Sequence, residues 1–545
     1  MVWREQCAPV SSRIIGGVCA LAVLITPALA QSTQKTFYSD DPLWREPAPL
    51  PVKHVEKMDI DQLYDFLDNS FVTPRHEKKT VRRSAHPALD INTVGDVPDS
   101  AWYTNRHYYH RMSLDELKRG PGSSTPPSPQ GVWRVVSAKS NGVMPGFVIE
   151  DEKKNRYLLK FDPPSQPELA SAADVIGSKF FYALGYNTPE NYVVHFNREK
   201  LEISPGVMFH DDVTGKKSPL TDRVIDQLLK PQPKSANGTY RAMASRWVPG
   251  SVVGPFWYVG TRSDDPNDIV PHEDRRELRG LRVFAAWLNH TDAKSINSLD
   301  SLVTENGIPY LKHYLIDFGS ILGSAGTDEK LPWYGHEYVI DPKGTGVQMM
   351  TLGLDPPSWD RTKYPKLTGV GRLDYKSFDP VSWKSDYPNP AFLLMDRDDA
   401  FWAAKQVAAF KDDEIRAMVE TGEFSDPRAV DWITECLIQR RNKIAEAWLS
   451  DTLPLDKFAV VDGRLTFADL EKGARYSVRW ASRDRGGRMT PLAEATGTEV
   501  PAMGNNAEYL VATITPLGAS GGSADPITVY LRHREPGFQV VGVDR

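Results

Sequence analysis

The sequence is poor in cysteine. Of its 545 residues, only Cys7, Cys19 and Cys436 are cysteines. Removal of the first thirty residues, which is argued below, would leave Cys436 alone, and one cysteine cannot form an intramolecular disulfide. The mature chain must therefore rely on a conventional hydrophobic core, for which roughly 515 residues, enough for two or three domains, are ample.

Long apolar runs and excess positive charge are scarce as well. After the N-terminal region, no stretch approaches the run of about 18 uncharged apolar residues that indicates a membrane-spanning helix. The net charge is −6, and it becomes −7 when Arg4, Glu5 and Arg13 are removed. This mild acidity argues against nucleic acid as the main partner, because phosphate backbones attract basic surfaces.

The N-terminus has the features of a secretory signal peptide. Arg4 and Arg13 supply positive charge before an apolar run from Ile14 to Ile25, and Ala28-Leu29-Ala30 gives the small-apolar-small pattern of a cleavage site. We therefore expect cleavage near Ala30 and a periplasmic or secreted protein. A signal anchor is the alternative interpretation, but the apolar stretch is short for a bilayer span, which needs about 20 residues.

Shifts in composition divide the chain into parts of different character. Prolines and aromatic residues crowd the segment after the signal peptide, and a linker rich in glycine, proline and serine begins at Gly120. The predicted fold class is α+β. The predicted parts are a signal peptide (1–30), an irregular N-terminal segment (31–125), a small mixed sheet with one helix (126–200), a larger and mainly helical region (201–455) and a small C-terminal β-sandwich (456–545).

Local patterns predict several individual elements. The strands Gly146–Glu150 and Arg156–Phe161 flank a charged turn and indicate a hairpin. A helix is expected from Glu168 to about Leu184, since apolar residues recur every four positions and Gly185 suits its C-terminal end. Further helices are predicted over the ranges Ile60–Leu67 (capped by Asp59), Glu273–Leu288, Ala400–Glu420 and Ala429–Leu449.

Two motifs carry groups suited to phosphoryl transfer. The first is His-Thr-Asp-Ala-Lys-Ser-Ile-Asn, from His290 to Asn297, and the second is Asp-Phe-Gly, from Asp317 to Gly319, directly after an apolar strand. Phosphoryl transfer needs positioned charge more than covalent help. Oxygen ligands such as an Asn carbonyl and one carboxylate suffice for Mg²⁺, which keeps several of its waters.

Each residue type in these motifs then has a possible task. Asp292 can accept the proton of an attacking hydroxyl, and Lys294 can neutralise charge on the migrating phosphoryl group. Asn297 and Asp317 are the expected magnesium ligands. Gly319 is expected to permit the backbone geometry that turns the Asp317 carboxylate back into the site.

The order and spacing of these motifs resemble the catalytic loop and Asp-Phe-Gly of eukaryotic-type protein kinases. Residues from about 130 to 455 look like an atypical member of the protein-kinase-like superfamily in the broad sense, which includes HipA-like, CotH-like and Fam20-like secreted kinases. The HipA-like resemblance lies in the stretch from Tyr157, Tyr-Leu-Leu-Lys-Phe-Asp, and in the helix that follows it.

The resemblance implies a bilobal core, ATP or another nucleoside triphosphate, and Mg²⁺. It makes Lys160, which lies within a strand, the lysine that grips the nucleotide phosphates and pairs with an acid on the next helix. Asp174 is the preferred acid, and Glu168 is the alternative, although a first-turn Glu also suits the helix dipole. The same resemblance assigns Asp292 as the catalytic aspartate.

The glycine-rich loop of the family is not matched. The nearest candidates for contact with the phosphates are Gly142 and Gly146, and Pro145 between them lacks a backbone donor. No Ala-Pro-Glu follows Asp317, and the gap between Asn297 and Asp317 is longer than in ordinary protein kinases. Two functions therefore stay open: a phosphoryl or nucleotidyl transferase that acts on a hydroxyl of protein, glycan or lipid in the cell envelope, or an inactive pseudokinase that binds or scaffolds there. The periplasm has no general ATP supply, which keeps the second function in view.

Overall fold

Two of the predictions fall outside the residues that the structure describes. The computed structural model describes residues 35–73, 86–123, 125–139, 146–211, 216–235, 237–350, 354, 356–450, 452–471, 473, 475–504, 507–517 and 525–545. The predicted signal peptide and Gly142 lie outside these ranges. The ranges proposed for the domains stay predictions.

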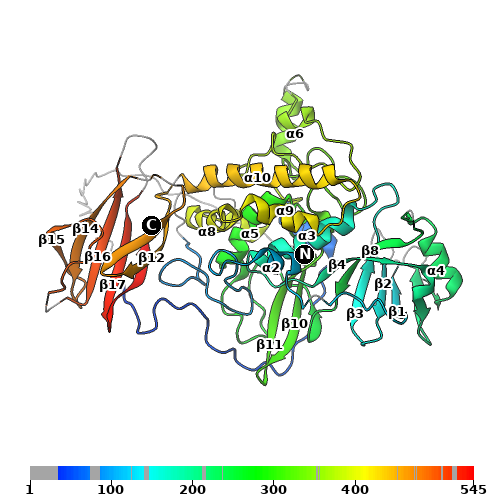
Figure 1. Cartoon of the computed structure of the whole chain (residues 1–545), viewed down its shortest axis with the longest axis horizontal. Helices are drawn as coiled ribbons and strands as arrows, with labels where there is room; N and C mark the ends of the chain where they lie inside the picture. The colour runs from blue at the N-terminus through cyan, green and yellow to red at the C-terminus, as the bar shows by residue number, and fades with distance from the viewer. Residues whose placement is uncertain are drawn as a thin grey trace, which may run out of the picture. The chain divides into compact units, whose positions relative to one another are not determined.

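The first large element is an eight-stranded mixed sheet, labelled in part in Figure 1. Its order is β4-β8-β3-β2-β1-β6-β7, and β5 pairs with β1. Tyr157 and Leu159 alternate into a buried apolar cluster, and Ile225 and Leu229 of helix α4 belong to the same cluster. The strands are β1 (Trp133–Lys139), β2 (Gly146–Glu150), β3 (Arg156–Lys160), β4 (Asn191–Phe196), β5 (Leu201–Ile203), β6 (Met208–Asp211), β7 (Lys216–Pro219) and β8 (Tyr240–Arg246), and α4 spans Asp222–Leu229.

The predicted hairpin and the helix after it are confirmed. Strands β2 and β3 pair antiparallel with Gly146 opposite Lys160, so Lys160 is the last residue of β3. Helix α3 (Leu169–Ala183) follows, and almost all of its residues are buried. Glu168 takes the N-cap position with a left-handed φ of 69° and makes no side-chain cap.

A second sheet has three antiparallel strands, in the order β11-β10-β9. These are β9 (Ser251–Gly254), β10 (Ser298–Glu305) and β11 (Ile308–Leu315). The β10-β11 turn consists of Asn306 and Gly307, both with positive φ, as a tight hairpin turn requires. Helix α5 (Arg276–Leu288) lies between β9 and β10 in the chain, and its predicted apolar residues Leu278, Leu281, Ala285 and Leu288 are all buried.

The predicted helix Ala400–Glu420 is wrong, since the segment forms two helices. Helix α8 (Arg397–Ala408) ends before Phe410, which is buried in the core, and α9 (Asp412–Glu420) then begins with three acidic residues. The Glu414 carboxylate accepts the Lys411 amide at 2.8 Å, and acidic residues favour a helix N-terminus. The structure also describes helices α2 (Leu114–Arg119), α6 (Pro342–Met350), α7 (Pro390–Leu394) and α10 (Pro427–Leu449).

The first helix is displaced from its predicted position. Helix α1 spans Gln62–Phe71, rather than 60–67, and its N-cap is Asp61 rather than Asp59. The Asp61 carboxylate accepts the Tyr64 amide at 3.0 Å, as an N-cap residue does. Two aspartates lie two residues apart here, and the sequence pattern could not choose between them.

The C-terminal residues form antiparallel β-structure. A two-stranded hairpin, β12 (Leu455–Val461) and β13 (Arg464–Asp469), shares one apolar cluster with a five-stranded sheet of order β15-β14-β16-β17-β18. The chain is therefore a mixed α+β protein with a separate C-terminal antiparallel sheet. No helix in the described ranges is long and apolar enough to cross a membrane. The five strands are β14 (Tyr476–Arg483), β15 (Met489–Thr496), β16 (Tyr509–Pro516), β17 (Ile527–Arg534) and β18 (Gly537–Asp544).

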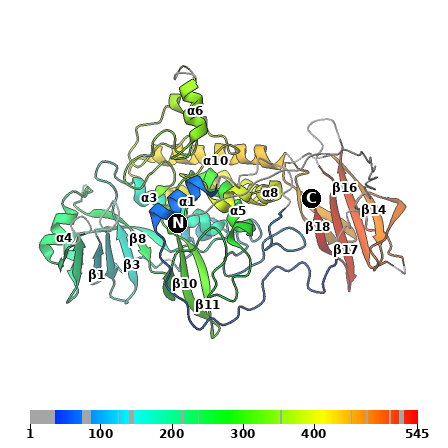
Figure 2. The same cartoon turned by 180° about the vertical axis from the view of Figure 1, so that it is seen from behind.

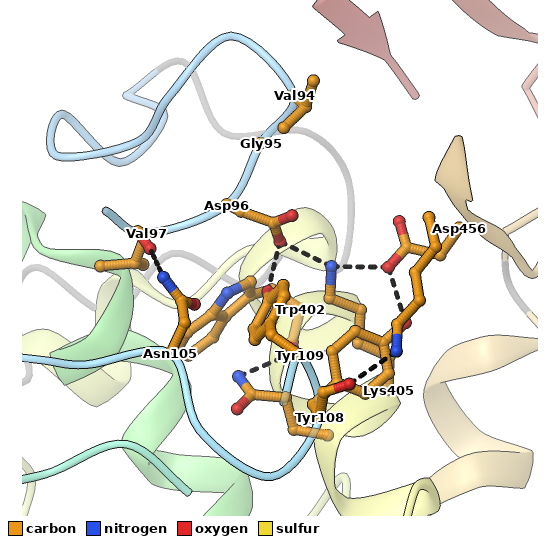
Figure 3. Close-up of polar contacts among 12 residues, drawn as sticks. Val94, Gly95, Asp96, Val97, Asn105, Tyr108, Tyr109, Trp402, Lys405 and Asp456 are labelled. Carbon is orange, nitrogen blue, oxygen red and sulfur yellow. Dashed lines mark hydrogen bonds and ion pairs between the residues drawn. The ribbon is translucent and has the colours of Figure 1, made fainter. Parts of the chain in front are cut away.

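A buried ionic cluster links three distant parts of the sequence (Figure 3). The Lys405 ammonium on α8 donates to Asp96 at 2.6 Å and to Asp456 of β12 at 2.8 Å. Tyr109 donates to Asp96 at 2.6 Å, and Tyr108 donates to Asp456 at 2.7 Å. Lys405 is 3% exposed, so its charge is stabilised by these partners rather than by water.

Replacing Lys405 with methionine would leave two buried carboxylates without their shared cation. We expect Lys405→Met to lower the free energy of unfolding by about 3–5 kcal/mol in urea denaturation. The matched control is Lys118→Met, whose exposed ion pair with Glu420 at 3.6 Å should be worth less than about 1 kcal/mol. Equal losses in the two variants would contradict this account of the cluster.

Candidate functional site

The β10-β11 hairpin brings the two sequence motifs together. Its strands pair with Ser298 opposite Leu315, so the residues just outside both strands meet at the open end of the hairpin. There the amide of Ile316 donates to the carbonyl of Asn297 at 3.0 Å. Asn297, the last residue of the first motif, is therefore hydrogen-bonded to the residue directly before Asp317. About twenty positions separate Asn297 from Asp317 in the sequence.

Lys160 connects the large sheet to this hairpin end. Its ammonium donates to Asp317 Oδ1 at 2.7 Å and lies 3.6 Å from Asp174 Oδ2 on α3. The Lys160 side chain is 34% exposed and that of Asp317 48%, whereas Asp174 is only 3% exposed. A strand lysine, a helix acid and the Asp-Phe-Gly aspartate thus form one ionic cluster that opens to solvent on the Asp317 side.

The structure decides between the two candidate acids on the helix. Asp174 Oδ1 accepts the Asn191 side-chain amide at 2.8 Å and the Phe318 backbone amide at 3.2 Å, so its carboxylate is fixed beside Lys160. Glu168 instead accepts the Ser425 amide at 2.9 Å. Asp174, rather than Glu168, is therefore the acid that the fold brings to Lys160.

The Asp-Phe-Gly segment is shaped differently from the prediction. The residue with left-handed backbone is Asp317 (φ 60°, ψ 63°), and Gly319 has no positive φ. The expectation that Gly319 supplies the unusual geometry is therefore wrong. The turn is held by the buried Phe318, whose ring stacks on that of Phe181 with 5.0 Å between the ring centroids. Phe318 also packs against Gly177, where a Cβ would lie 2.5 Å from the Phe318 side chain.

The residues of the first motif contact one another. The Asn297 side-chain amide donates both to the backbone carbonyl of Asp292 and to Asp292 Oδ2, each at 2.8 Å. Lys294 forms an ion pair with Asp292 Oδ1 and lies 3.9 Å from Asp386. Asp292 and Lys294 are 21% and 25% exposed, so both side chains reach solvent. Asp292, Lys294 and Asn297 thus form one hydrogen-bonded unit.

Two residues that the sequence did not indicate, the buried Lys330 and the half-buried Asp386, contact this loop. Lys330 donates to the Thr291 hydroxyl at 2.5 Å, and burial lowers its pKa to about 8. The Asp386 amide donates to the Thr291 carbonyl at 2.8 Å, and burial raises the pKa of its carboxyl to about 6. No motif surrounds either residue, and both are distant from the loop in sequence, so only the fold identifies them.

The charges around Lys160 act on one another strongly. Burial works to lower the pKa of Lys160, but the carboxylates of Asp317 and Asp174 more than offset it, so the pKa lies above its ordinary value. The Lys160 charge holds the pKa of Asp317 below its usual range. Burial raises the pKa of Asp174 to about 6, and the charge of Lys160 opposes that shift. At neutral pH, Lys160 and Asp317 are therefore both charged.

The donor set is compatible with a magnesium ion. Asn297 uses its amide nitrogen for Asp292, so its side-chain carbonyl is the arm that remains for a cation, and Asp317 presents a half-exposed carboxylate close by. Within the described residues, no group of three or more His, Cys, Asp or Glu side chains could hold a metal ion. Magnesium does not need such a group, since it accepts one or two protein oxygens and completes its shell with water and phosphate.

Of the two glycines that were candidates for contact with the phosphates, the structure describes Gly146 but not Gly142. Gly146 pairs with Lys160 across the β2-β3 ladder, and a Cβ there would lie 2.9 Å from the Leu159 carbonyl. Gly146 is therefore required for close approach of the two strands next to Lys160, and contact of Gly146 with phosphate stays a prediction.

Comparison with known proteins finds distant structural similarity. The chain matches no family model and no curated protein. Among solved structures, it is similar to the crystal structure of the Golgi casein kinase with 9% sequence identity and a TM-score of 0.27, over 74% of this chain and 95% of that chain. Similarity at this level is too remote to carry an argument, so the proposals below rest on the geometry of the site.

The raised pKa of Asp174 predicts a pH-dependent stability. Burial raises the pKa of Asp174 in the folded protein to about 6, whereas an unfolded aspartate has its ordinary pKa of 3.8. The stability from this group is therefore fully present below about pH 4 and is lost as the pH rises through about 6. Asp174→Asn cannot titrate, so between about pH 3.5 and pH 7 the wild type should lose roughly 3 kcal/mol relative to this variant.

The measurement is chemical denaturation of both proteins at a series of pH values. Because groups distant from position 174 titrate equally in both, the difference between the two curves reports Asp174 together with its effect on its partners Lys160 and Asp317. A constant difference across this range would show that Asp174 is not held in a buried, charge-disfavouring environment.

Proposed function

We propose that the chain is an exported kinase-like phosphotransferase with a bilobal core, which transfers a phosphoryl (or nucleotidyl) group from a Mg²⁺-bound nucleoside triphosphate to a hydroxyl. The observation that carries the proposal is the ionic cluster of Lys160, Asp174 and Asp317. A strand lysine that pairs with a helix acid and also reaches the Asp-Phe-Gly aspartate is the arrangement that a kinase uses to place its phosphates and metal.

Each side chain then has a defined part in the proposed reaction. Lys160 binds the α- and β-phosphates, and Asn297 with Asp317 holds Mg²⁺, which neutralises charge on the phosphates. Asp292 accepts the acceptor's hydroxyl proton as the acceptor oxygen bonds to the γ-phosphorus. The bond from that phosphorus to the β,γ-bridging oxygen breaks, and the nucleoside diphosphate leaves. Lys294 lies beside Asp292, where it can stabilise the migrating charge.

The first thirty residues support a location outside the cytoplasm, in the periplasm or the medium. The acceptor would then be a hydroxyl of protein, glycan or lipid in the cell envelope, and the donor would need a local source. The proposal does not involve nucleic acid, in keeping with the acidic net charge.

A second candidate is a pseudokinase that binds nucleotide, or an envelope partner, without turnover. The observation that favours it is the sequence before Gly146, which lacks the Gly-x-Gly-x-x-Gly pattern and contains Pro145. A proline removes one backbone donor from a loop that otherwise cradles phosphate. The two candidates share a binding site and differ in whether Asp292 is used.

The test is to titrate mature wild type and two variants with Mg²⁺–ATP, and to follow release of labelled γ-phosphate to water or to a cell-envelope fraction. We expect Asp317→Ala to abolish the metal-dependent binding. Asp292→Asn should bind the nucleotide normally, because the residue does not contact the metal in the proposal, and should lower turnover by roughly 100- to 10,000-fold. Ser477→Ala, on the separate C-terminal sheet, is the control.

Each outcome has a distinct meaning. Binding and turnover that follow these variants support the phosphotransferase. Binding that requires Asp317, with turnover absent from wild type and Asp292→Asn alike, supports the pseudokinase. The absence of binding to ATP and to other nucleoside triphosphates would overturn the nucleotide site.

A further inference from the structure

Helix α1 is oriented with its polar side toward the protein. Asp65 and Asn69 of α1, and Thr73 just after its end, recur every four residues and are buried. On the opposite side Leu63 is 65% exposed and Phe71 is 55% exposed. A surface helix ordinarily buries its apolar stripe, so the inward contacts of α1 are not ordinary core packing. What these polar side chains contact therefore decides what the helix does.

The main inward contact is with residues around the first motif. Asp65 Oδ2 accepts the Tyr387 hydroxyl at 2.6 Å. Asp65 Oδ1 accepts the Asn69 side-chain amide at 2.8 Å and the Ser295 hydroxyl at 3.5 Å. Ser295 lies directly after Lys294 in the first motif. The Asp65 residue is 1% exposed, and its carboxylate thus contacts both Ser295 within the first motif and Tyr387.

Tyr387 extends this contact to Lys294. The Lys294 ammonium lies 5.9 Å from the centroid of the Tyr387 ring, within the range of a cation–π contact. Phe66 of α1 packs edge-on against the same ring at 5.5 Å, so the ring is fixed from the α1 side by Phe66 and Asp65 together. Asp65, Lys294, Ser295 and Tyr387 also line one pocket.

The segment that leads to α1 is fixed to the hairpin sheet, which accounts for its placement. The Val52 amide donates to Pro309 of β11 at 2.8 Å, and the Met58 amide donates to Val253 of β9 at 2.7 Å. Gly254 leaves room for this segment, because a Cβ there would meet the Met58 carbonyl. The chain then enters α1, which is labelled in Figure 2.

We propose that Asp65 is a positioning residue of the phosphotransfer site: through Tyr387 and Ser295 it fixes Lys294 where the γ-phosphate is to lie. This inference rests on the proposed function and extends it, since it makes the N-terminal segment part of the site. Lys294 is paired with Asp292, the residue that accepts the hydroxyl proton in the proposed transfer of the γ-phosphoryl group. Lys294 is therefore the cation that would distinguish a triphosphate from a diphosphate. Loss of Asp65 should therefore affect ATP and ADP differently.

The experiment compares the affinities of Mg²⁺–ATP and Mg²⁺–ADP in the full mature chain by calorimetry. We expect Asp65→Asn to weaken ATP binding about tenfold, the effect of one misplaced charge-assisted contact, and to leave ADP binding unchanged. Tyr387→Phe should give a similar change, and the double variant should lose no more than either single variant, since both act through one contact. The matched control is Asp61→Asn, which keeps a good N-cap on the same helix and should behave as wild type.

A merely structural role for Asp65 would weaken ATP and ADP binding equally or leave both unchanged, and either result would overturn the proposal. If the wild type binds no nucleotide, the proposed function fails, and hydrogen exchange then tests Asp65 separately. Amides of residues 290–297 should exchange faster in Asp65→Asn than in wild type or Asp61→Asn. Equal exchange in all three proteins would show that Asp65 does not order the loop.

Discussion

The ion pairs of Lys160 with Asp174 and Asp317 are the constraint on which the rest of the site depends. Three segments that are distant in sequence supply these side chains: the end of β3, the middle of α3 and the turn after β11. Asp174 is buried and would be costly to ionise alone, so it needs the lysine, while Asn191 and the Phe318 amide fix its direction. The left-handed backbone of Asp317 is maintained by the packing of Phe318 against α3.

The hairpin β10-β11 then determines where the second half of the site lies. Its tight turn fixes the register, and the register places Asn297 beside Ile316 at the open end. Asn297 holds Asp292, while the buried Lys330 contacts Thr291 and the half-buried Asp386 lies beside Lys294. Helix α1 adds Asp65, so a segment outside the two motifs reaches the same loop.

The sequence could predict what depends on local pattern. The β2-β3 hairpin, helix α3, the apolar stripe of α5 and the residues of both motifs followed from periodicity and spacing. The choice of Asp174 over Glu168 as the acid beside Lys160 agrees with the structure, whereas Lys160, expected inside a strand, is the last residue of β3. Errors arose where two local patterns competed, as at the N-cap of α1, or where a new helix begins within one apolar pattern, as α9 does at the acidic residues after Phe410. Lys330, Asp386 and Asp65 could not be found, because each reaches the site through a contact that spans many residues and leaves no periodic signal.

The central claim is that Lys160 faces the phosphates of a bound nucleotide, and chemical labelling tests it most directly. An acyl-phosphate derivative of ATP transfers its acyl group to a lysine amine near the phosphates, and mass spectrometry of the digested protein identifies that lysine. We expect Lys160 to be the main labelled residue in the presence of Mg²⁺, with labelling suppressed by excess ATP. Exposed Lys154, in the turn of the same hairpin and paired with Glu150 at 2.9 Å, should react no more than other surface lysines and should not be protected. Labelling of Lys160 and Lys154 to the same extent, without protection by ATP, would contradict the account.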